Sequence, residues 1–588
     1  MRCVAIEYKD YPAVEWVVTF RNLGSSDTPV IENIQALNTD VGRLVKSGDF
    51  KLFHADGSHA IITDFQPLEK TLMPGDSFNL ASYGGRSSDG ALPFFNLAKP
   101  DGGGVSLGVG WTGQWATSFK RIGGGSVNVQ AGMEATHFKL HPNEEVRTPS
   151  ILMVFWSGQD RMRGQNLLRS LLLAHFSPTI GGKPANPPLA ASPHAVIAFE
   201  KSTEKNMLEA ISNIAAHKTP FDCWWIDAGW YACENNWARW VGNPDPDLAR
   251  YPNGMKPIAD AAHAAGLKFL LWFEPERVMP DTWLYKNHPD WLLKPPTTMP
   301  QEVLYQFNDK FHLFNLGNPE ALKWLKDKVS GMIGNTGIDI YRNDFNMYPL
   351  YYWQSGEDPD RQGINEIRYV TGLYDYLDTL RREHPNLLLD NCASGGRRID
   401  FEMLRRSVVL TRSDYLWDPI GQQSHTYGLA QWIPITGIGA ADTSVYSCRS
   451  GYGSHFALAA DFYSKSPEFW QSVSRTLNEL KSLKSFYAGD FTPLGRYTMS
   501  DNQWMAWQFD RADMGQGVVQ AFRRPKSKES STRFYPSGLD PQQTYELTDL
   551  DTKTTQTLAG SVLMEQGLEI KISDAPGSAV VTYKKFAN

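Results

Sequence analysis

Between residues 194 and 500, short apolar runs alternate with longer amphipathic segments, and this alternation restricts the fold more than any other feature of the sequence. The run Phe221–Asp227, for example, is followed by the helix-like segment Met255–Ala265 and then by the run Lys268–Phe273. A strand–helix–strand order with buried strands is typical of a parallel sheet covered by helices. Repeated over this length, it predicts an α/β fold with a central (β/α)8 TIM barrel at residues 194–500.

Further segments continue the pattern. In the helix that Asn318 opens, Pro319 suits the first turn and the charge of Glu320 complements the helix dipole. The other expected strands are Ala195–Phe199, Ile338–Asp344, Leu387–Asn391, Val408–Ser413 and Trp432–Thr436, and the other expected helices are Thr203–His217 and one within Asn365–Arg382.

The regions on both sides of the barrel are expected to be all-β. Residues 1–175 contain alternating apolar runs, such as 14–20 and 105–111, between glycine-rich turns, which predicts a large N-terminal β-sandwich. Residues 176–193 are rich in proline and glycine and are expected to be a linker. Residues 501–588 return to short alternating strands and predict a small C-terminal antiparallel β-domain, a second sandwich.

The bulk composition excludes several classes of partner. The net charge is −7 with no basic run, which argues against nucleic acid and against an anionic membrane surface. Five scattered cysteines without a CxxC pair indicate neither a disulfide framework nor a zinc site. There is no apolar run of membrane-spanning length. The first residues lack a signal-peptide pattern, so we expect a cytoplasmic protein or, if an export signal was trimmed, a secreted or periplasmic one.

Two of the expected strands end on an aspartate. Asp344 follows Arg342, whose guanidinium favours an ionised carboxylate, and an ionised carboxylate is a competent nucleophile. Asp414 precedes Tyr415 and Trp417, and aromatic surroundings raise the pKa of a carboxyl group, as a general acid requires. The structural alternatives are a rim aspartate paired with Arg342 and an aspartate that caps a loop or helix. Paired carboxylates at the ends of barrel strands are what glycosidic bond cleavage requires.

Other strand ends carry candidate binding residues. Asp227 lies between Trp225 and Trp230, a combination that suits hydrogen bonding to sugar hydroxyls with ring stacking, although structural burial of the tryptophans is an equal alternative. The segment Cys392–Arg398 contains two glycines that let backbone amides approach a ligand, and either Arg397 or Arg398 is expected to pair with a neighbouring carboxylate. A phosphate-binding loop is a weaker interpretation of that segment, because the spacing of known phosphate motifs is absent.

The segment Trp272–Arg277 also closes a strand with carboxylates. Glu274 and Glu276 lie beside Arg277, and we favour a supporting salt-bridge network over a catalytic role for them.

Taken in order, these motifs resemble glycoside hydrolase family 36, whose members are mainly α-galactosidases and which is related to family 27. The resemblance covers essentially the whole chain and rests on Trp-Ile-Asp-x-Gly-Trp, Trp-Phe-Glu-Pro-Glu, Tyr-Arg-Asn-Asp-Phe-Asn, Cys-x-Ser-Gly-Gly-Arg and Arg-Ser-Asp. It implies that Asp344 is the nucleophile on the fourth strand and that Asp414 is the acid/base on the sixth. It further implies that Asp227 binds a hydroxyl at C4 or C6, that Arg342 replaces a sugar-binding lysine, and that Cys392 and Gly395 line the C2 pocket.

The chain departs from the family pattern at two places. The second acid of the usual Asp-Asp-Gly-Trp is Ala228, and the usual Lys-Trp before the nucleophile is Arg342-Asn343. The resemblance implies galactose as the glycone. Because the lost carboxylate weakens the hold on O4 or O6, N-acetylgalactosamine, galactosamine and arabinopyranose are the alternatives.

The expected activity is that of a retaining α-galactosidase that acts on terminal α-galactosides, with a carbohydrate as partner and without a metal or organic cofactor. Two rivals are a non-catalytic carbohydrate-binding protein and a phosphate-handling barrel enzyme. The loop 86–95 is expected to approach the barrel mouth of the same or a neighbouring subunit, so a homo-oligomer is one expectation. The candidate site residues are Asp344 and Asp414 for catalysis, and Asp227, Trp225, Trp230, Trp272, Arg342, Cys392, Gly395 and Arg397 for substrate binding.

Overall fold

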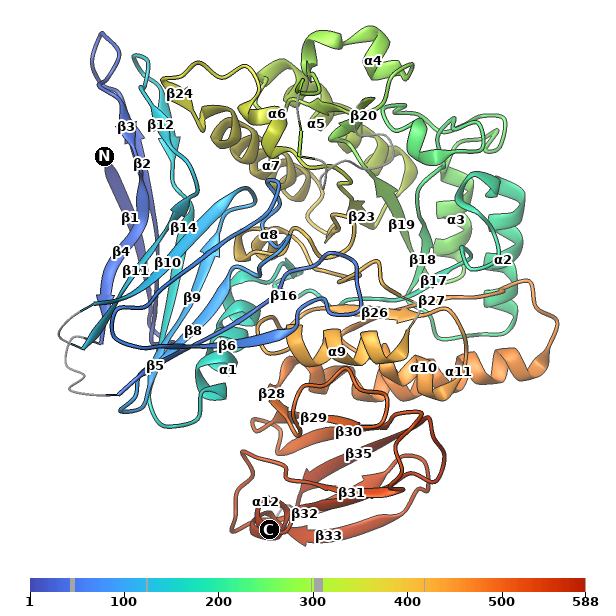
Figure 1. Cartoon of the computed structure of the whole chain (residues 1–588). Helices are drawn as coiled ribbons and strands as arrows, with labels where there is room; N and C mark the ends of the chain where they lie inside the picture. The colour runs from blue at the N-terminus through green and yellow to red at the C-terminus, as the bar shows by residue number, and fades with distance from the viewer. Residues whose placement is uncertain (43–47, 123–124, 298, 301–309, 417, 587–588) are drawn as a thin grey trace.

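The computed structural model describes residues 1–586 with gaps at 43–47, 123–124, 298, 301–309 and 417. Figure 1 shows two N-terminal sheets, a central sheet surrounded by helices, and a C-terminal sheet region that lies beneath them in the view. The strands of the central sheet lead to the candidate residues Asp227 and Asp344, and the N-terminal and C-terminal regions pack against this central part.

The central sheet is curled and entirely parallel. Its order is β25–β23–β19–β18–β17–β27–β26, and each neighbouring pair runs in the same direction. Single bridges join Asp390 to Val408 and Val409 to Thr436, so residues 408–409 connect one edge of the sheet to the residue that precedes the other edge. The strands are β17 (Leu189–Ser192), β18 (Cys223–Ile226), β19 (Lys268–Phe273), β23 (Ile340–Asn343), β25 (Leu388–Asn391), β26 (Gly437–Ala440) and β27 (His455–Ala459).

The helices around this sheet begin and end on local sequence signals. Thr203 caps α2 (Glu204–Ala216) in a reciprocal pair with the side chain of Asn206. Asn318 accepts two backbone N–H groups at the start of α5 (Pro319–Thr336), which ends at Gly337 in the left-handed conformation, with φ 84°. The remaining long helices are α3 (Lys256–Ala264), α7 (Ile364–Glu383), α9 (Pro419–Leu429) and α11 (Pro467–Leu483).

Three of the expected strand positions were wrong. The first strand is β17 (Leu189–Ser192), inside the segment expected to be a linker, whereas 195–199 contains turns and the start of a short 3₁₀ helix. Residues 408–413 form isolated bridges rather than a continuous strand. The expected strand 432–436 is replaced by β26 (Gly437–Ala440), and β27 (His455–Ala459) was not anticipated.

The N-terminal region contains two antiparallel sheets. The first has the order β1–β2–β14–β9–β8–β5–β6 and the second β4–β11–β10–β7. The runs expected at 14–20 and 105–111 correspond to β2 (Ala13–Arg21) and β9 (Gly104–Gly110). The other strands are β1 (Arg2–Tyr8), β4 (Gln35–Val41), β5 (Phe50–Ala55), β6 (Pro67–Leu72), β7 (Ser77–Ala81), β8 (Phe94–Ala98), β10 (Trp115–Ile122), β11 (Ser126–Met133) and β14 (Ser150–Trp156).

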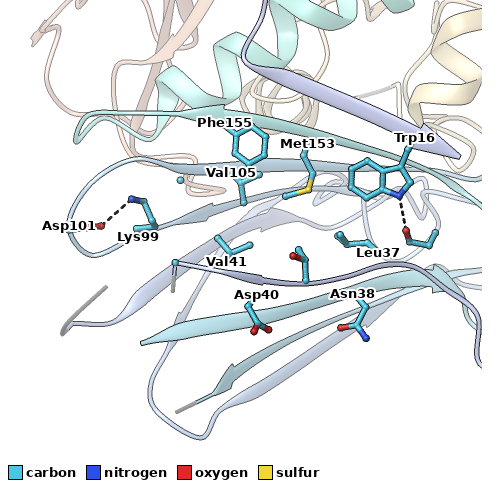
Figure 2. Close-up of a pocket in the computed structure, with 14 residues that line it drawn as sticks. Trp16, Leu37, Asn38, Asp40, Val41, Lys99, Asp101, Val105, Met153 and Phe155 are labelled. Atoms are coloured by element: carbon cyan, nitrogen blue, oxygen red, sulfur yellow. Dashed lines mark hydrogen bonds and ion pairs between the residues drawn. The ribbon is translucent and has the colours of Figure 1, made fainter. Parts of the chain in front are cut away.

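A cavity of about 690 Å³ lies between these two sheets (Figure 2). Its walls include Trp16, Val105 and Met153 from the first sheet and Leu37 from the second, and the Trp16 indole donates to the Ala36 carbonyl oxygen at 2.8 Å. The candidate site residues do not line it.

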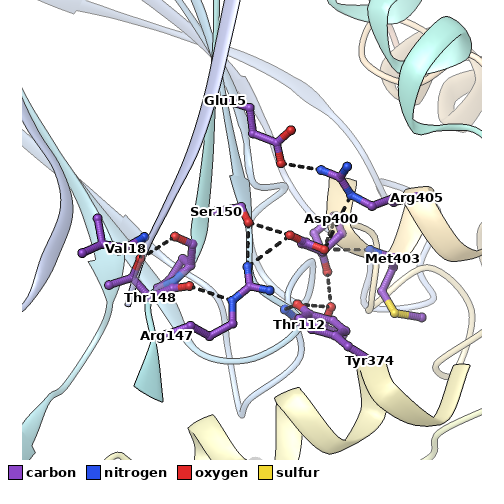
Figure 3. Close-up of polar contacts among 12 residues, drawn as sticks. Glu15, Val18, Thr112, Arg147, Thr148, Ser150, Tyr374, Asp400, Met403 and Arg405 are labelled. Atoms are coloured by element: carbon purple, nitrogen blue, oxygen red, sulfur yellow. Dashed lines mark hydrogen bonds and ion pairs between the residues drawn. The ribbon is translucent and has the colours of Figure 1, made fainter. Parts of the chain in front are cut away.

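Buried polar contacts join the first N-terminal sheet to the helix α8 (Phe401–Arg406) (Figure 3). Glu402 accepts from the hydroxyl of Ser150 at 2.5 Å and pairs with Arg147 at 3.2 Å. Asp400 caps α8 through the N–H groups of Glu402 and Met403, and its other oxygen accepts from Thr112 at 3.0 Å. The N-terminal region thereby fixes the segment that follows β25.

The C-terminal region is an antiparallel sheet with the order β28–β29–β30–β35–β32–β33 beside a two-stranded sheet, β31–β34. The short strands expected there are present, and the longest of them are β29 (Trp504–Arg511), β30 (Gln516–Arg523), β32 (Thr544–Asp549) and β35 (Gly577–Lys585). The others are β28 (Asp490–Pro493), β31 (Ser531–Phe534), β33 (Thr555–Ala559) and β34 (Leu568–Lys571). Among the described residues, no helix has both the length and the apolar character needed to cross a bilayer.

Candidate active site

Asp344 follows β23 at the carboxyl edge of the parallel sheet and is held by four hydrogen-bond donors. One carboxylate oxygen accepts from the N–H of Phe345 at 2.7 Å and from the N–H of Ser394 at 3.0 Å. The other accepts from the Asn346 amide at 2.8 Å and from the Trp272 indole at 3.1 Å. A carboxylate with this many donors is fixed in place and stabilised in its charged form.

The electrostatic surroundings of Asp344 also favour the charged form. Burial alone would raise the pKa of Asp344, but the charge of Arg342 and the bonds from Asn346 and Ser394 outweigh it, and the pKa lies below its ordinary value. Arg342 in turn forms an ion pair with Asp390, and its guanidinium stacks 4.5 Å from the centre of the Trp225 ring. Asp344 is therefore ionised at neutral pH, as a nucleophile must be.

Asp414 has the opposite character. The Asp414 side chain is accessible to solvent through the open cavity, but the protein surrounds this cavity on its other sides. The resulting loss of hydration, together with the negative charge of Asp344, raises the pKa of Asp414 to about 7. Within the described ranges, no hydrogen bond to the Asp414 carboxylate is formed. Trp417, expected beside it, lies outside the described residues. A carboxyl group with this pKa can donate a proton at neutral pH and accept it again.

Asp227 follows β18 and is held by a third set of contacts. Its carboxylate accepts from the Trp225 indole at 2.9 Å and from the N–H of Ala228 at 2.9 Å, and it lies 3.8 Å from Nε of Arg342. The N–H of Asp227 donates to Nε2 of His194 at 3.2 Å. Asp227 is partly exposed, so one face of its carboxylate is free to meet a ligand.

These groups share a cavity of about 360 Å³ at the carboxyl edge of the sheet, a volume in the range of small-molecule sites. Seven candidate residues line it: Trp225, Asp227, Trp272, Arg342, Asp344, Cys392 and Asp414. The two cavities of about 690 and 1000 Å³ elsewhere in the described structure contain none of them, so size alone does not locate the site.

Three candidates, Trp230, Gly395 and Arg397, do not line this cavity and lie behind its wall. The chain turns at Gly229, with φ 79°, and the buried indole of Trp230 donates to the Trp272 carbonyl at 2.7 Å. Gly395, with φ 83°, forms a backbone bridge with Ser413. Arg397 donates to the carbonyl oxygens of Ser394 and His59 at 3.3 and 2.7 Å.

The cavity also contains residues that the sequence reasoning did not assign to the site. They are His194, Ser192, Phe199, Trp237, Asn346 and Thr411, together with Leu416 and a small-residue wall from β26 and β27. Asn346 was visible as a polar neighbour of Asp344 in the sequence, whereas His194 directly follows the proline-rich stretch 176–193, where no strand end was expected. Inside the described ranges, no cluster of three or more His, Cys, Asp or Glu residues is arranged to hold a metal ion.

The carboxylates of the Trp272–Arg277 segment are in ion pairs, as expected. Arg277 makes a two-fold contact with Glu274 at 2.7 and 2.5 Å, and Arg398 makes one with Glu276 at 2.8 and 3.0 Å. Glu274 also accepts from the N–H of Asn346 at 2.7 Å, which connects this network to the donor beside Asp344.

The loop 86–95 reaches the site of its own chain. Arg86 is buried, pairs with Asp89 at 2.6 Å and donates to the hydroxyl of Ser394 at 3.3 Å. Ser394 donates its N–H to Asp344, so this N-terminal loop supports the segment that binds the candidate nucleophile.

An ionised aspartate and a second one of near-neutral pKa lie in one cavity, and cleavage of a glycosidic bond requires two carboxyl groups in these two states. The melibiase family profile matches residues 148–450, and the profile of the glycosyl hydrolase family 36 C-terminal domain matches residues 504–583. The chain belongs to the melibiase family, glycoside hydrolase family 36.

Named relatives agree with this assignment. The chain is 25% identical to the alpha-galactosidase Mel36A of Lactobacillus acidophilus over a 601-residue alignment that covers 99% of this chain and 79% of the relative. It is 23% identical to alpha-galactosidase 1 of Pediococcus pentosaceus, with 95% and 76% covered.

Solved structures share the fold. The alpha-galactosidase of Lactobacillus brevis superposes with a TM-score of 0.84 at 20% identity and covers 98% of this chain and 78% of its own. The alpha-galactosidase AgaA of Geobacillus stearothermophilus, solved in complex with stachyose, has the same TM-score at 20% identity, with 98% and 80% covered.

Proposed function

We propose that this chain is a retaining α-galactosidase that removes terminal α-linked galactose from oligosaccharides or glycoconjugates. The observation that carries the proposal is the contrast between Asp344, whose pKa lies below its ordinary value, and Asp414, whose pKa is about 7, in one cavity. The names of the relatives supply the substrate class, since alpha-galactosidases cover nearly the whole chain. Crystal structures of AgaA hold raffinose and stachyose, both of which such an enzyme would cleave.

In the proposed mechanism, Asp344 attacks the anomeric carbon while Asp414 gives its proton to the leaving oxygen. The C1–O bond breaks as the bond between C1 and the Asp344 oxygen forms. Asp414, now ionised, takes a proton from water, and that water displaces Asp344 from the sugar with net retention. The two carboxyl groups are expected at the separation of about 5–5.5 Å that is typical of retaining enzymes.

The hydrogen bonds around Asp344 support this division of labour. The N–H of Ser394 and the indole of Trp272 keep the carboxylate charged and oriented before substrate binds. In this proposal, Trp225, Trp272, Asp227 and Arg342 contact the glycone, whereas Trp230, Gly395 and Arg397 act from behind the cavity wall.

The glycone is the finer part of the proposal. Ala228 is buried and stands where the family usually has a second acid, so Asp227 alone supplies a carboxylate at that position. This departure favours a second candidate function, the cleavage of α-N-acetylgalactosaminides, galactosaminides or β-L-arabinopyranosides on the same scaffold.

We also propose that the parallel sheet closes as a barrel of eight positions, in which the segment 408–413 occupies the sixth position through isolated bridges instead of a continuous strand. The bridges from Asp390 to Val408 and from Val409 to Thr436 support this closure. The two N-terminal sheets would then form a β-sandwich, with division points near residues 175, 193 and 500 except that β17 (Leu189–Ser192) belongs to the barrel. A homo-oligomer stays a prediction that sedimentation analysis can test.

A panel of nitrophenyl glycosides tests the function. We expect hydrolysis of the α-galactoside to exceed that of the α-N-acetylgalactosaminide, the α-galactosaminide and the β-L-arabinopyranoside. Asp344→Asn should abolish turnover while the fold, measured by circular dichroism, is unchanged. Unchanged hydrolysis in that variant would refute the proposed mechanism. A preference of the wild type for another sugar would change the assigned glycone and leave the mechanism as proposed.

A further inference from the structure

The loop between β5 and β6, residues 56–66, extends from the N-terminal sheets to the catalytic edge of the parallel sheet (Figure 1). Nε2 of His425, on α9, donates to the Ile61 carbonyl oxygen at 3.0 Å. The Phe65 side chain is fully buried, and its carbonyl oxygen lies against Gly428, where a Cβ would come within 1.9 Å. The contacts of Ile61 and Phe65 with α9 therefore hold the loop in one position, and the residues that it contacts are held with it.

Asp64 is the centre of this loop and is almost completely buried, with 1% exposed. One carboxylate oxygen accepts from the N–H groups of His59 and Ile61 at 2.8 and 3.2 Å. The other accepts from the hydroxyl of Ser58 at 2.7 Å and, across to the catalytic region, from the hydroxyl of Ser413 at 2.6 Å. A carboxylate only accepts hydrogen bonds, and this one uses both oxygens to hold four donors.

Ser413 directly precedes Asp414 and is fully buried. Its hydroxyl donates to Asp64 and also accepts from the N–H of Tyr415 at 3.2 Å. Its backbone forms a bridge with Gly395. One hydroxyl thereby ties the residues on both sides of Asp414 to the N-terminal loop.

Asp414 depends on this backbone support, because its own carboxylate has no hydrogen bond among the described residues. Asp344, in contrast, is held directly by four donors. A group that moves a proton must lie within hydrogen-bond reach of the reacting oxygen, so a shift of its backbone is felt in catalysis.

We propose that Asp64 is a positioning residue for the general acid/base: it acts through the hydroxyl of Ser413 and sets where the Asp414 carboxyl group meets the leaving oxygen. The assignment rests on the proposed function of Asp414. In this proposal, a residue of the N-terminal region affects the proton transfer without contacting the substrate.

The experiment compares two aryl glycosides of the sugar that the panel identifies, one with phenol and one with 2,4-dinitrophenol as leaving group. Phenolate needs a proton to depart, whereas dinitrophenolate leaves without one. Ser413→Ala and Asp64→Asn should lower kcat/KM for the phenyl glycoside about tenfold or more, while the value for the dinitrophenyl glycoside changes by less than about threefold. Ser413→Ala removes one hydroxyl and is the variant to use if Asp64→Asn does not fold.

Two controls separate the possible outcomes. Ser58→Ala removes a bond to the same oxygen of Asp64 but leaves the contact to Ser413, and it should not create the dependence on leaving group. Asp414→Asn should show that dependence in full, at about 10²–10⁴-fold. The positioning role is refuted if Asp414→Asn shows the dependence on leaving group but Ser413→Ala does not. In that case Ser413→Ala would either lower kcat/KM equally for both glycosides or leave both values unchanged. If Asp414→Asn shows none, the acid/base assignment itself fails, and the role of Asp64 fails with it.

Discussion

Glu366, in the first turn of α7, is expected to make the stability of the protein depend on pH. Its side chain is buried, and one carboxyl oxygen accepts from the Trp111 indole and from the N–H of Gln114, both at 2.7 Å. Burial outweighs these bonds and raises the pKa of Glu366 from 4.5 to about 8. The carboxyl group is therefore protonated at neutral pH, at the contact between the N-terminal region and the catalytic sheet.

The sign of the effect follows from proton binding. Below pH 4.5 the folded and unfolded chains both hold the proton, and the contribution to stability is complete. Between pH 4.5 and about 8 only the unfolded chain releases it, so the free energy of unfolding falls as the pH rises. At about 1.4 kcal/mol per pKa unit, the loss reaches at most about 5 kcal/mol above pH 8.

Glu366→Gln tests this reasoning, because the amide oxygen can accept the same two bonds and cannot ionise. Urea unfolding of both proteins, followed by tryptophan fluorescence, should show a variant that is only about 1.4 kcal/mol more stable than the wild type at pH 5.5, one unit above the unfolded pKa, and up to about 5 kcal/mol more stable at pH 9. Glu209→Gln, at an exposed position of α2, is the matched control and should follow the wild type at both pH values. A Glu366→Gln midpoint that differs from wild type by the same amount at pH 5.5 and pH 9 would refute the assignment.

Three further outcomes concern the active site. A plot of kcat/KM against pH should fall above a pKa of about 7 as Asp414 loses its proton, and its acid limb should lie below the ordinary aspartate range because Asp344 is stabilised as a charge. Asp227→Asn removes a negative charge that raises the pKa of Asp414, so the alkaline limb should move to lower pH while KM rises; an unmoved limb would contradict this. Trp272→Phe removes a 3.1 Å bond to the Asp344 carboxylate and should lower kcat/KM about tenfold or more, with unchanged activity counting against the bond.

The sequence predicted the parts of the fold where local pattern and tertiary environment agree. The helix after Asn318 has a cap, a first-turn proline and a terminal glycine, and it begins and ends on those residues. The strand Leu189–Ser192 was missed because prolines precede and follow it and its residues are small, while the more apolar 195–199 drew the assignment. The strand Gly437–Ala440 was missed for the same reason, since its two glycines and one alanine carry no strand preference.

The candidate site shows a similar division. Asp344 and Asp227 follow strands that local apolar runs identify, so the sequence placed both in one cavity. Trp230 is only three residues from Asp227, but the turn at Gly229 sends its indole behind the wall, a change of direction that spacing alone does not reveal. Asp64 is separated from Ser413 by 349 residues, and no local pattern connects them.

The contacts at the catalytic edge show why residues so far apart belong to one site. Ser394, which donates to the proposed nucleophile, contacts Arg86 of one N-terminal loop. Ser413, which precedes the proposed acid/base, contacts Asp64 of another. Parallel strands bring carboxylates to one edge, but the loops that follow them have no ladder to fix their positions. In this protein the N-terminal region supplies buried charges that hold two of those loops. The strands therefore determine which residues meet in the cavity, and in our proposal an N-terminal loop, through Asp64, sets the orientation of Asp414 there.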